Sequence, residues 1–144
     1  MREKVTDFEQ IERYELYREI RAYLPVPVRE ESQLDGAEVF VGGDPGEVVV
    51  RVRKNRVSVS IYAVEWEGPH TPVTRSKGIG KLNWKRLPAP RLLMALRILI
   101  ESAREIRRSR YGKCELCGKS NPPEWMHDGK TCQLCAERHL GVVH

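Results

Sequence analysis

The first pattern along the chain is helical. Apolar residues recur at approximately helical spacing between residues 6 and 24, at Phe8, Ile11, Leu16, Ile20 and Leu24. This period predicts an amphipathic helix over residues 6–24, which Thr6 or Asp7 can cap and Pro25 ends. Residues 25–36 are then expected to form a linker.

An alternating pattern follows. Val48, Val50 and Val52 share one face of a predicted strand, and the apolar residues of residues 56–64 share one face of the next. Alternation of this kind is typical of an antiparallel sheet with one face in the core and one in water. We expect three or four such strands over about residues 37–86, with the polar, glycine-containing residues 65–80 as a loop.

A longer helical pattern covers residues 88–111. Its apolar stripe consists of Leu92, Ala95, Leu96, Leu99, Ala103 and Ile106. Pro88 and Pro90 lie at its entrance, where a missing N–H costs nothing. The predicted fold class is therefore α+β, a small antiparallel sheet packed with an N-terminal helix and a long helix.

The remaining segment contains all four cysteines of the chain. They form two C-x-x-C pairs, Cys114/Cys117 and Cys132/Cys135, separated by fourteen residues. Two such pairs can surround one Zn²⁺ with four thiolates, a tetrahedral arrangement that zinc favours. Four sulfurs leave no open position for water, so the predicted zinc ion is structural and binds once per chain.

The residues around the cysteines resemble a known class of zinc fingers. A knuckle with Gly118, a chain reversal and a helix that opens with C-x-x-C look like a treble clef or zinc ribbon, and the run PPEWM…CAERHLGVVH resembles the tails of uncharacterised bacterial proteins. The resemblance implies a zinc module over residues 112–144, after a domain over residues 1–111. Treble clefs serve nucleic-acid binding, protein interaction and nuclease activity, so the fold alone does not decide the function.

Two histidines lie close enough to the cysteines to compete as ligands. His127 precedes Cys132 by five residues and His139 follows Cys135 by four, but four thiolates are the simpler set. His127 also raises the alternative of an HNH-type nuclease, whose catalytic histidine can lie between two C-x-x-C pairs. Only residues 128–131 separate His127 from Cys132, which leaves little room for such a site, and no other catalytic constellation is visible. We therefore expect no enzyme.

Positive charge offers a candidate binding surface. The net charge is +5, with −3 in residues 1–36 and +4 in each of residues 37–87 and 88–144. The candidate phosphate-binding residues are Arg75 and Lys77 of the predicted loop, Arg97, Arg104, Arg107 and Arg108 of the long helix, and Lys113. Arginines near the end of a helix also complement its dipole, and a polar loop is often only a solvated surface, so a purely structural role stays open.

The leading hypothesis is a non-enzymatic zinc protein that binds nucleic acid. The alternative is an adaptor for protein interaction or regulation, in which zinc only staples the tail. No stretch is apolar enough to span a membrane, and no signal peptide is visible, so a cytoplasmic location with reduced cysteines is expected.

Overall fold

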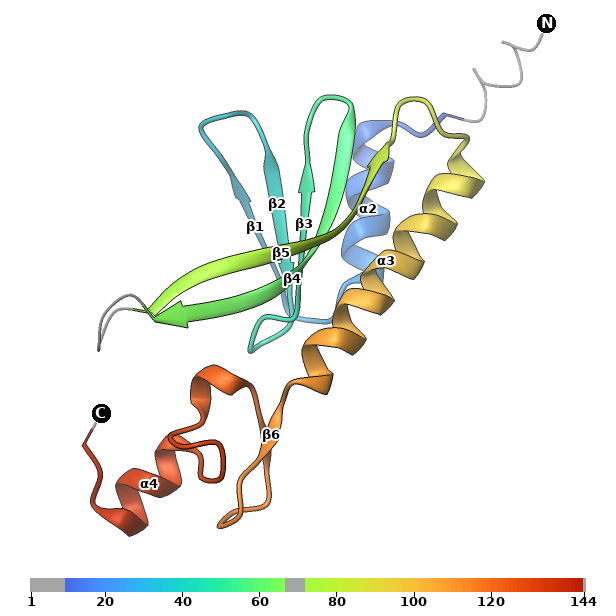
Figure 1. Cartoon of the computed structure of the whole chain (residues 1–144). Coiled ribbons are helices and arrows are strands. Elements are labelled where there is room, and N and C mark those ends of the chain that lie inside the picture. The colour runs from blue at the N-terminus through green and yellow to red at the C-terminus, as the bar shows by residue number, and fades with distance from the viewer. Residues whose placement is uncertain (1–9, 67–71, 144) are drawn as a thin grey trace, which may run out of the picture.

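The computed structural model describes residues 10–66 and 72–143 (Figure 1). The helices are α2 (Arg13–Tyr23), α3 (Ala89–Ser109) and α4 (Gln133–Leu140), with a short 3₁₀ helix, η1, at Pro123–Trp125. The strands are β1 (Val28–Ser32), β2 (Glu38–Gly42), β3 (Val48–Val52), β4 (Arg56–Trp66), β5 (Pro72–Asn83), β6 (Gly112–Lys113) and β7 (Ser120–Asn121). The predicted α+β class is confirmed.

The main sheet is an antiparallel meander of five strands in the order β1-β2-β3-β4-β5. The two strands expected from the alternating pattern form a hairpin, and at its turn the backbone N–H of Arg53 donates to the carbonyl of Arg56 at 2.7 Å. Valines of β3 and β4 stand opposite each other, as in the pair Val50 and Val59. Because facing residues share one face of the sheet, the valines form a continuous apolar surface.

Two predictions within this region are wrong. The linker expected over residues 25–36 contains β1, which pairs with β2. Of the loop expected over residues 65–80, the described residues 65–66 end β4 and residues 72–80 belong to β5. Both missed strands are sheet edges and most of their described side chains are exposed, so neither has the alternation of apolar and polar residues that marks a half-buried strand.

The core lies between the two longer helices and one face of the sheet. Leu16 and Ile20 of α2 pack with Phe40 and with the valines of β3 and β4. The α3 residues of this core are Leu92, Leu96, Ala103 and, beyond the predicted stripe, Ile100, whereas Ala95 of the stripe is not part of it. Tyr17 contacts Phe40 with ring centroids 5.3 Å apart. The long helix predicted over residues 88–111 is confirmed as α3, which begins after Pro88.

The N-terminal helix is shorter than predicted. α2 begins at Arg13, and Glu12 forms a capping box with Glu15. The predicted caps Thr6 and Asp7 lie outside the described residues. Packing explains the start, because Leu16 is the first fully buried residue of the helix.

The sheet curls strongly. The face opposite the helices, which was expected to be exposed to water, is therefore partly covered. The register of β4 and β5 shifts between Val59 and Ser60, and such a bulge bends a hairpin. In Figure 1 the far half of the hairpin passes across β1, β2 and β3. Arg51 of β3 donates to the hydroxyl of Ser76 of β5 at 3.2 Å, which confirms this closeness. Val39 and Val49 are consequently buried on the face opposite the helices.

Within residues 10–66 and 72–143, none of the helices combines the length and the apolar character needed to cross a lipid bilayer.

Candidate metal centre and adjoining surfaces

The first cysteine pair lies on a tight turn directly after α3. Strands β6 and β7 pair across it, and Cys114 exchanges backbone hydrogen bonds with Lys119 and Gly118, at 3.0 and 2.8 Å. Gly118 has φ +76, a left-handed conformation that glycine adopts at no steric cost. The N–H of Cys117 points at the sulfur of Cys114, 3.5 Å away. The turn therefore places both sulfurs on one side and supplies an N–H to a thiolate.

The second pair lies at the start of α4. Cys132 is the N-cap residue of this helix and Cys135 is in its first turn. The N-terminal end of a helix carries partial positive charge, which favours a thiolate over a thiol. An isolated bridge between Met126 and Cys132 closes the preceding loop, and Met126 packs against the buried cysteines.

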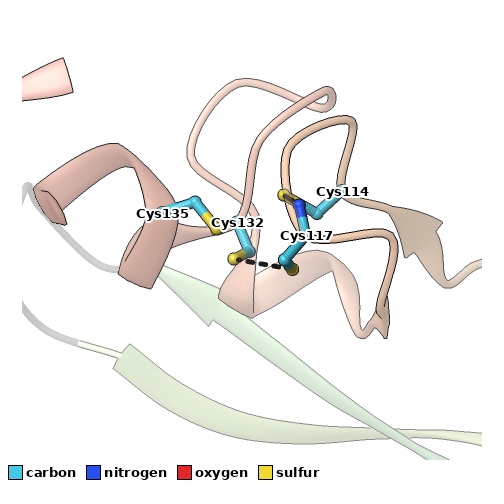
Figure 2. A group of neighbouring side chains, drawn as sticks. All are labelled: Cys114, Cys117, Cys132 and Cys135. Carbon is cyan, nitrogen blue, oxygen red and sulfur yellow. Dashed lines mark hydrogen bonds between the residues drawn. The ribbon is translucent and has the colours of Figure 1, made fainter. Parts of the chain in front are cut away.

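The four sulfur atoms converge on one point. All lie within 4.8 Å of one another, and those of Cys117 and Cys132 are 3.9 Å apart (Figure 2). Four Zn–S bonds of about 2.3 Å in a tetrahedron require sulfur–sulfur separations of about 3.8 Å. The residues therefore fit one zinc ion, and the predicted ligand set is confirmed as a cluster.

The pKa values of the cysteine thiols also favour the binding of a cation at this site. Backbone N–H groups, chiefly that of Cys117 and then that of Cys132, lower the pKa of the Cys114 thiol to about 6. Burial and then hydrogen bonds with the neighbouring thiols raise the pKa of Cys135 to about 12. The site thus readily holds one thiolate, while further thiolates repel one another. A bound dication removes this conflict, because its charge offsets the thiolates.

The two histidines lie outside this cluster. The cysteines alone form the metal-binding group found among the described residues, while His127 and His139 are exposed. The backbone N–H of His127 donates to the carbonyl of Thr131. Asp128 accepts from the N–H groups of Lys130 and Thr131, both at 2.9 Å, and these bonds lower its pKa. Residues 127–131 thus form a tight turn.

A buried ion pair joins the metal module to the sheet. The Nη1 and Nη2 atoms of Arg107 donate to the two carboxylate oxygens of Glu124, at 3.1 and 2.5 Å. The Nε atom of Arg107 donates to the carbonyl of Gly46 at 3.0 Å. The guanidinium lies between the rings of Tyr62 and Tyr111, 5.4 and 5.3 Å from their centroids. Arg107 is therefore not available to a phosphate, and its place on the predicted binding surface is corrected.

The other predicted arginines on α3 are exposed but partly engaged. Arg97 lies over the ring of Tyr23, 4.7 Å from the centroid. Arg104 donates to Glu47 at 2.8 Å. Glu101 and Glu105 are on the same helix and offset part of the positive charge. Arg108 and Lys113 are exposed as well.

The two halves of the predicted basic surface lie on opposite flanks of α3. Arg97 and Arg104 contact α2 and the turn before β3. Leu99, on the other flank, lies against Gly80 of β5, where an added Cβ would be 2.7 Å from a Leu99 methyl carbon. The basic residues of β5 and the exposed arginines of α3 therefore do not form one continuous patch.

Strand β5 and the turn after it carry the least compensated charge. Residues 72–87 contain Arg75, Lys77, Lys81, Lys85 and Arg86 and no acidic residue. All five are exposed, although Arg75 pairs with Glu65 at 3.3 Å. Lysines on a sheet edge also prevent the edge from pairing with other chains, which is the structural alternative to a binding role.

A cleft of about 680 Å³ separates the curled sheet from the metal module. Sequence reasoning missed it, because its walls come from segments far apart in the chain. Its lining residues include Arg29 of β1, Tyr62 of β4, Thr74 of β5, and Trp125 and Gln133 of the metal module. The sequence suggests that Trp125 closes a small core over the zinc, but the structure leaves its side chain 46% exposed at this cleft.

Comparison of the chain with models of protein families, with curated proteins and with solved structures finds no match. The function must therefore be argued from the geometry of the metal centre and of the surfaces beside it.

Proposed function

We propose that this chain is a non-enzymatic binding protein that engages nucleic acid, with a structural, treble-clef-like zinc centre. The observation that carries the proposal is the charge of residues 72–87, five basic side chains without an acidic one. These residues follow a free edge of the sheet for the full length of β5. The basic side chains lie on both faces of this edge, since Lys77 is opposite Ile61 and Lys81 is opposite Ser58. A nucleic-acid backbone along the edge presents negative charges to both faces.

The zinc supports this function indirectly. Its four sulfur ligands leave no position for a substrate or water, and the buried pair of Arg107 with Glu124 holds the module against the sheet. Metal binding therefore organises the surface next to β5 and takes no part in chemistry. Arg108, in the last turn of α3, and Lys113 of β6 add positive charge that is separate from that of β5.

Salt dependence tests the proposal. Fluorescence anisotropy of labelled single- and double-stranded oligonucleotides, measured with the zinc-loaded protein, should show affinity that falls steeply as salt rises, because each neutralised phosphate releases a counterion. Replacement of Lys77 and Lys81 by Ala should reduce the slope of log affinity against log salt by about 1 per lysine. No binding to any oligonucleotide at low salt would exclude the proposal.

A second candidate, a protein-interaction adaptor, rests on a different observation. The metal module exposes Leu116, Leu134 and Leu140, and Trp125 with Leu134 borders a hollow of about 420 Å³ over the cysteines. Exposed apolar side chains gathered on a small module are typical of a protein contact. An interaction that is insensitive to salt and lost on substitution of Leu134 would favour this candidate.

A further inference from the structure

The cleft between the curled sheet and the metal module has the size of a ligand site. A volume of about 680 Å³ lies within the range of small-ligand sites, about 300–1,000 Å³. Thr74 lines it from β5, and Lys81 lies on the same face of that strand, whereas Arg75 and Lys77 lie on its other face. A single strand that runs along this edge therefore meets basic residues on both sides before it reaches the cleft.

Trp125 is held in place on the metal-module wall of this cleft. Its backbone N–H donates to the carbonyl of Pro122 at 3.0 Å. The preceding residue, Glu124, is fixed from two sides, because its carboxylate pairs with Arg107 and its carbonyl accepts from Gln133 at 3.1 Å. The indole nevertheless keeps 46% of its surface exposed. Because its backbone is fixed, only the two side-chain torsions of the indole lose freedom when a flat group stacks on it.

The charged residues that line the cleft leave a positive charge available to a phosphate, because one of the two lining carboxylates is already neutralised. Arg29 is exposed on the wall opposite the metal module, and the described residues offer its guanidinium no ion pair. Glu124 also lines the cleft, but Arg107 neutralises its carboxylate. Asp44 is the remaining carboxylate among the lining residues, and it is exposed to water.

We propose that the cleft binds a nucleobase of a single-stranded nucleic acid, with the base stacked on Trp125 and the adjoining phosphate near Arg29. This inference rests on the proposed nucleic-acid function and specifies its form. Proteins that bind single strands combine a positively charged path for the backbone with aromatic rings for the bases. Here β5 provides the path and Trp125 the ring. In a duplex the bases are already stacked on one another, so the cleft selects single strands.

The test compares two labelled single strands of about 12 nucleotides, a length within the usual range of binding sites. One is oligothymidylate, and the other is an abasic phosphodiester of equal length and charge. Anisotropy titrations at one low salt concentration use the full-length, zinc-loaded chain. We expect the base-containing strand to bind about 5- to 100-fold more tightly, the factor associated with stacking of one base.

Variants assign this preference to the cleft. Trp125→Leu should abolish it, Trp125→Phe should retain most of it, and Leu116→Ala, at an exposed leucine of the same module outside the cleft, should leave it unchanged. Arg29→Ala should weaken both strands, whereas Arg91→Ala, at an exposed arginine remote from the cleft, should not. The wild-type comparison needs no variant, so it decides the question even if a variant fails to fold.

Two outcomes would overturn the inference in different ways. Equal affinity of the wild type for both strands, with salt-dependent binding retained, would refute the stacking site and leave the nucleic-acid function standing. Failure of both strands to bind at low salt would refute both, and the cleft would then suit an extended peptide.

Discussion

Arg107 of α3 and Glu124 of the metal module form a two-bond ion pair with only 4% and 8% of their side chains exposed. It links the end of the long helix to the segment between the two C-x-x-C pairs. The same guanidinium donates to the carbonyl of Gly46. One buried charge thus connects the sheet, α3 and the metal module, and the metal and the main core are expected to be energetically coupled.

Glu124→Ala should strongly destabilise the protein. The substitution leaves the Arg107 charge buried without its partner, which costs about 3–5 kcal/mol in free energy of unfolding. Urea denaturation followed by circular dichroism measures this cost. Glu30→Ala is the matched control, because it breaks the exposed pair of Glu30 and Arg21 and should cost at most about 1 kcal/mol. Equal effects of the two substitutions would contradict the coupling.

Removal of the metal should weaken the connection that Arg107 and Glu124 make between the main domain and the metal module. Elemental analysis should find about one zinc per chain, and a chelator should abolish the order of residues 112–143, since so small a module lacks a core of its own. Because Glu124 is then no longer held, the main domain should also lose stability. In Glu124→Ala, chelation should destabilise the main domain less than in the wild type. Full retention of α4 in metal-free protein would refute a structural role of the zinc.

Tyr111→Phe should preserve or raise stability. The Tyr111 hydroxyl is buried and has no hydrogen-bond partner among the described residues, so its removal sacrifices no bond and relieves desolvation. Burial also raises the pKa of Tyr111. The folded state therefore resists ionisation of this phenol, whereas the unfolded chain ionises near pH 10. The free energy of unfolding is thus unaffected by this ionisation below about pH 10 and falls as the pH rises further. The variant should lose less stability between pH 10 and 11; a loss of more than about 1 kcal/mol at neutral pH would show that the hydroxyl has a partner.

Gly46→Ala should disturb the packing of residue 46 against Tyr62, next to Arg107. An added Cβ would lie 2.7 Å from the ring of Tyr62, and overpacking of this kind costs about 1–3 kcal/mol. Gly78→Ala is the control, because a Cβ added there would meet no atom within 4 Å and the backbone is not left-handed. Thermal unfolding of both variants measures the difference. The same stability for both would mean that Tyr62 moves aside freely.

The local patterns determined much of this protein. The stripe from Leu92 to Ala103 predicted α3, the alternating valines predicted the central hairpin, and two C-x-x-C pairs predicted the sulfur cluster. Each of these signals depends on residues close in the chain, so periodicity and spacing alone reveal them. The division into a domain over residues 1–111 and a zinc module over residues 112–144 stays a prediction.

Tertiary structure decided the rest. The edge strands β1 and β5 are stabilised by pairing with a neighbour, and most of their side chains face water, so no burial pattern marked them. Arg107 was counted among the candidate phosphate-binding residues, yet the fold buries it, because Glu124, Gly46 and two tyrosines converge there from distant segments. The cleft beside Trp125 likewise exists only because the sheet curls toward the metal module. Long-range packing of this kind leaves no local trace in the sequence.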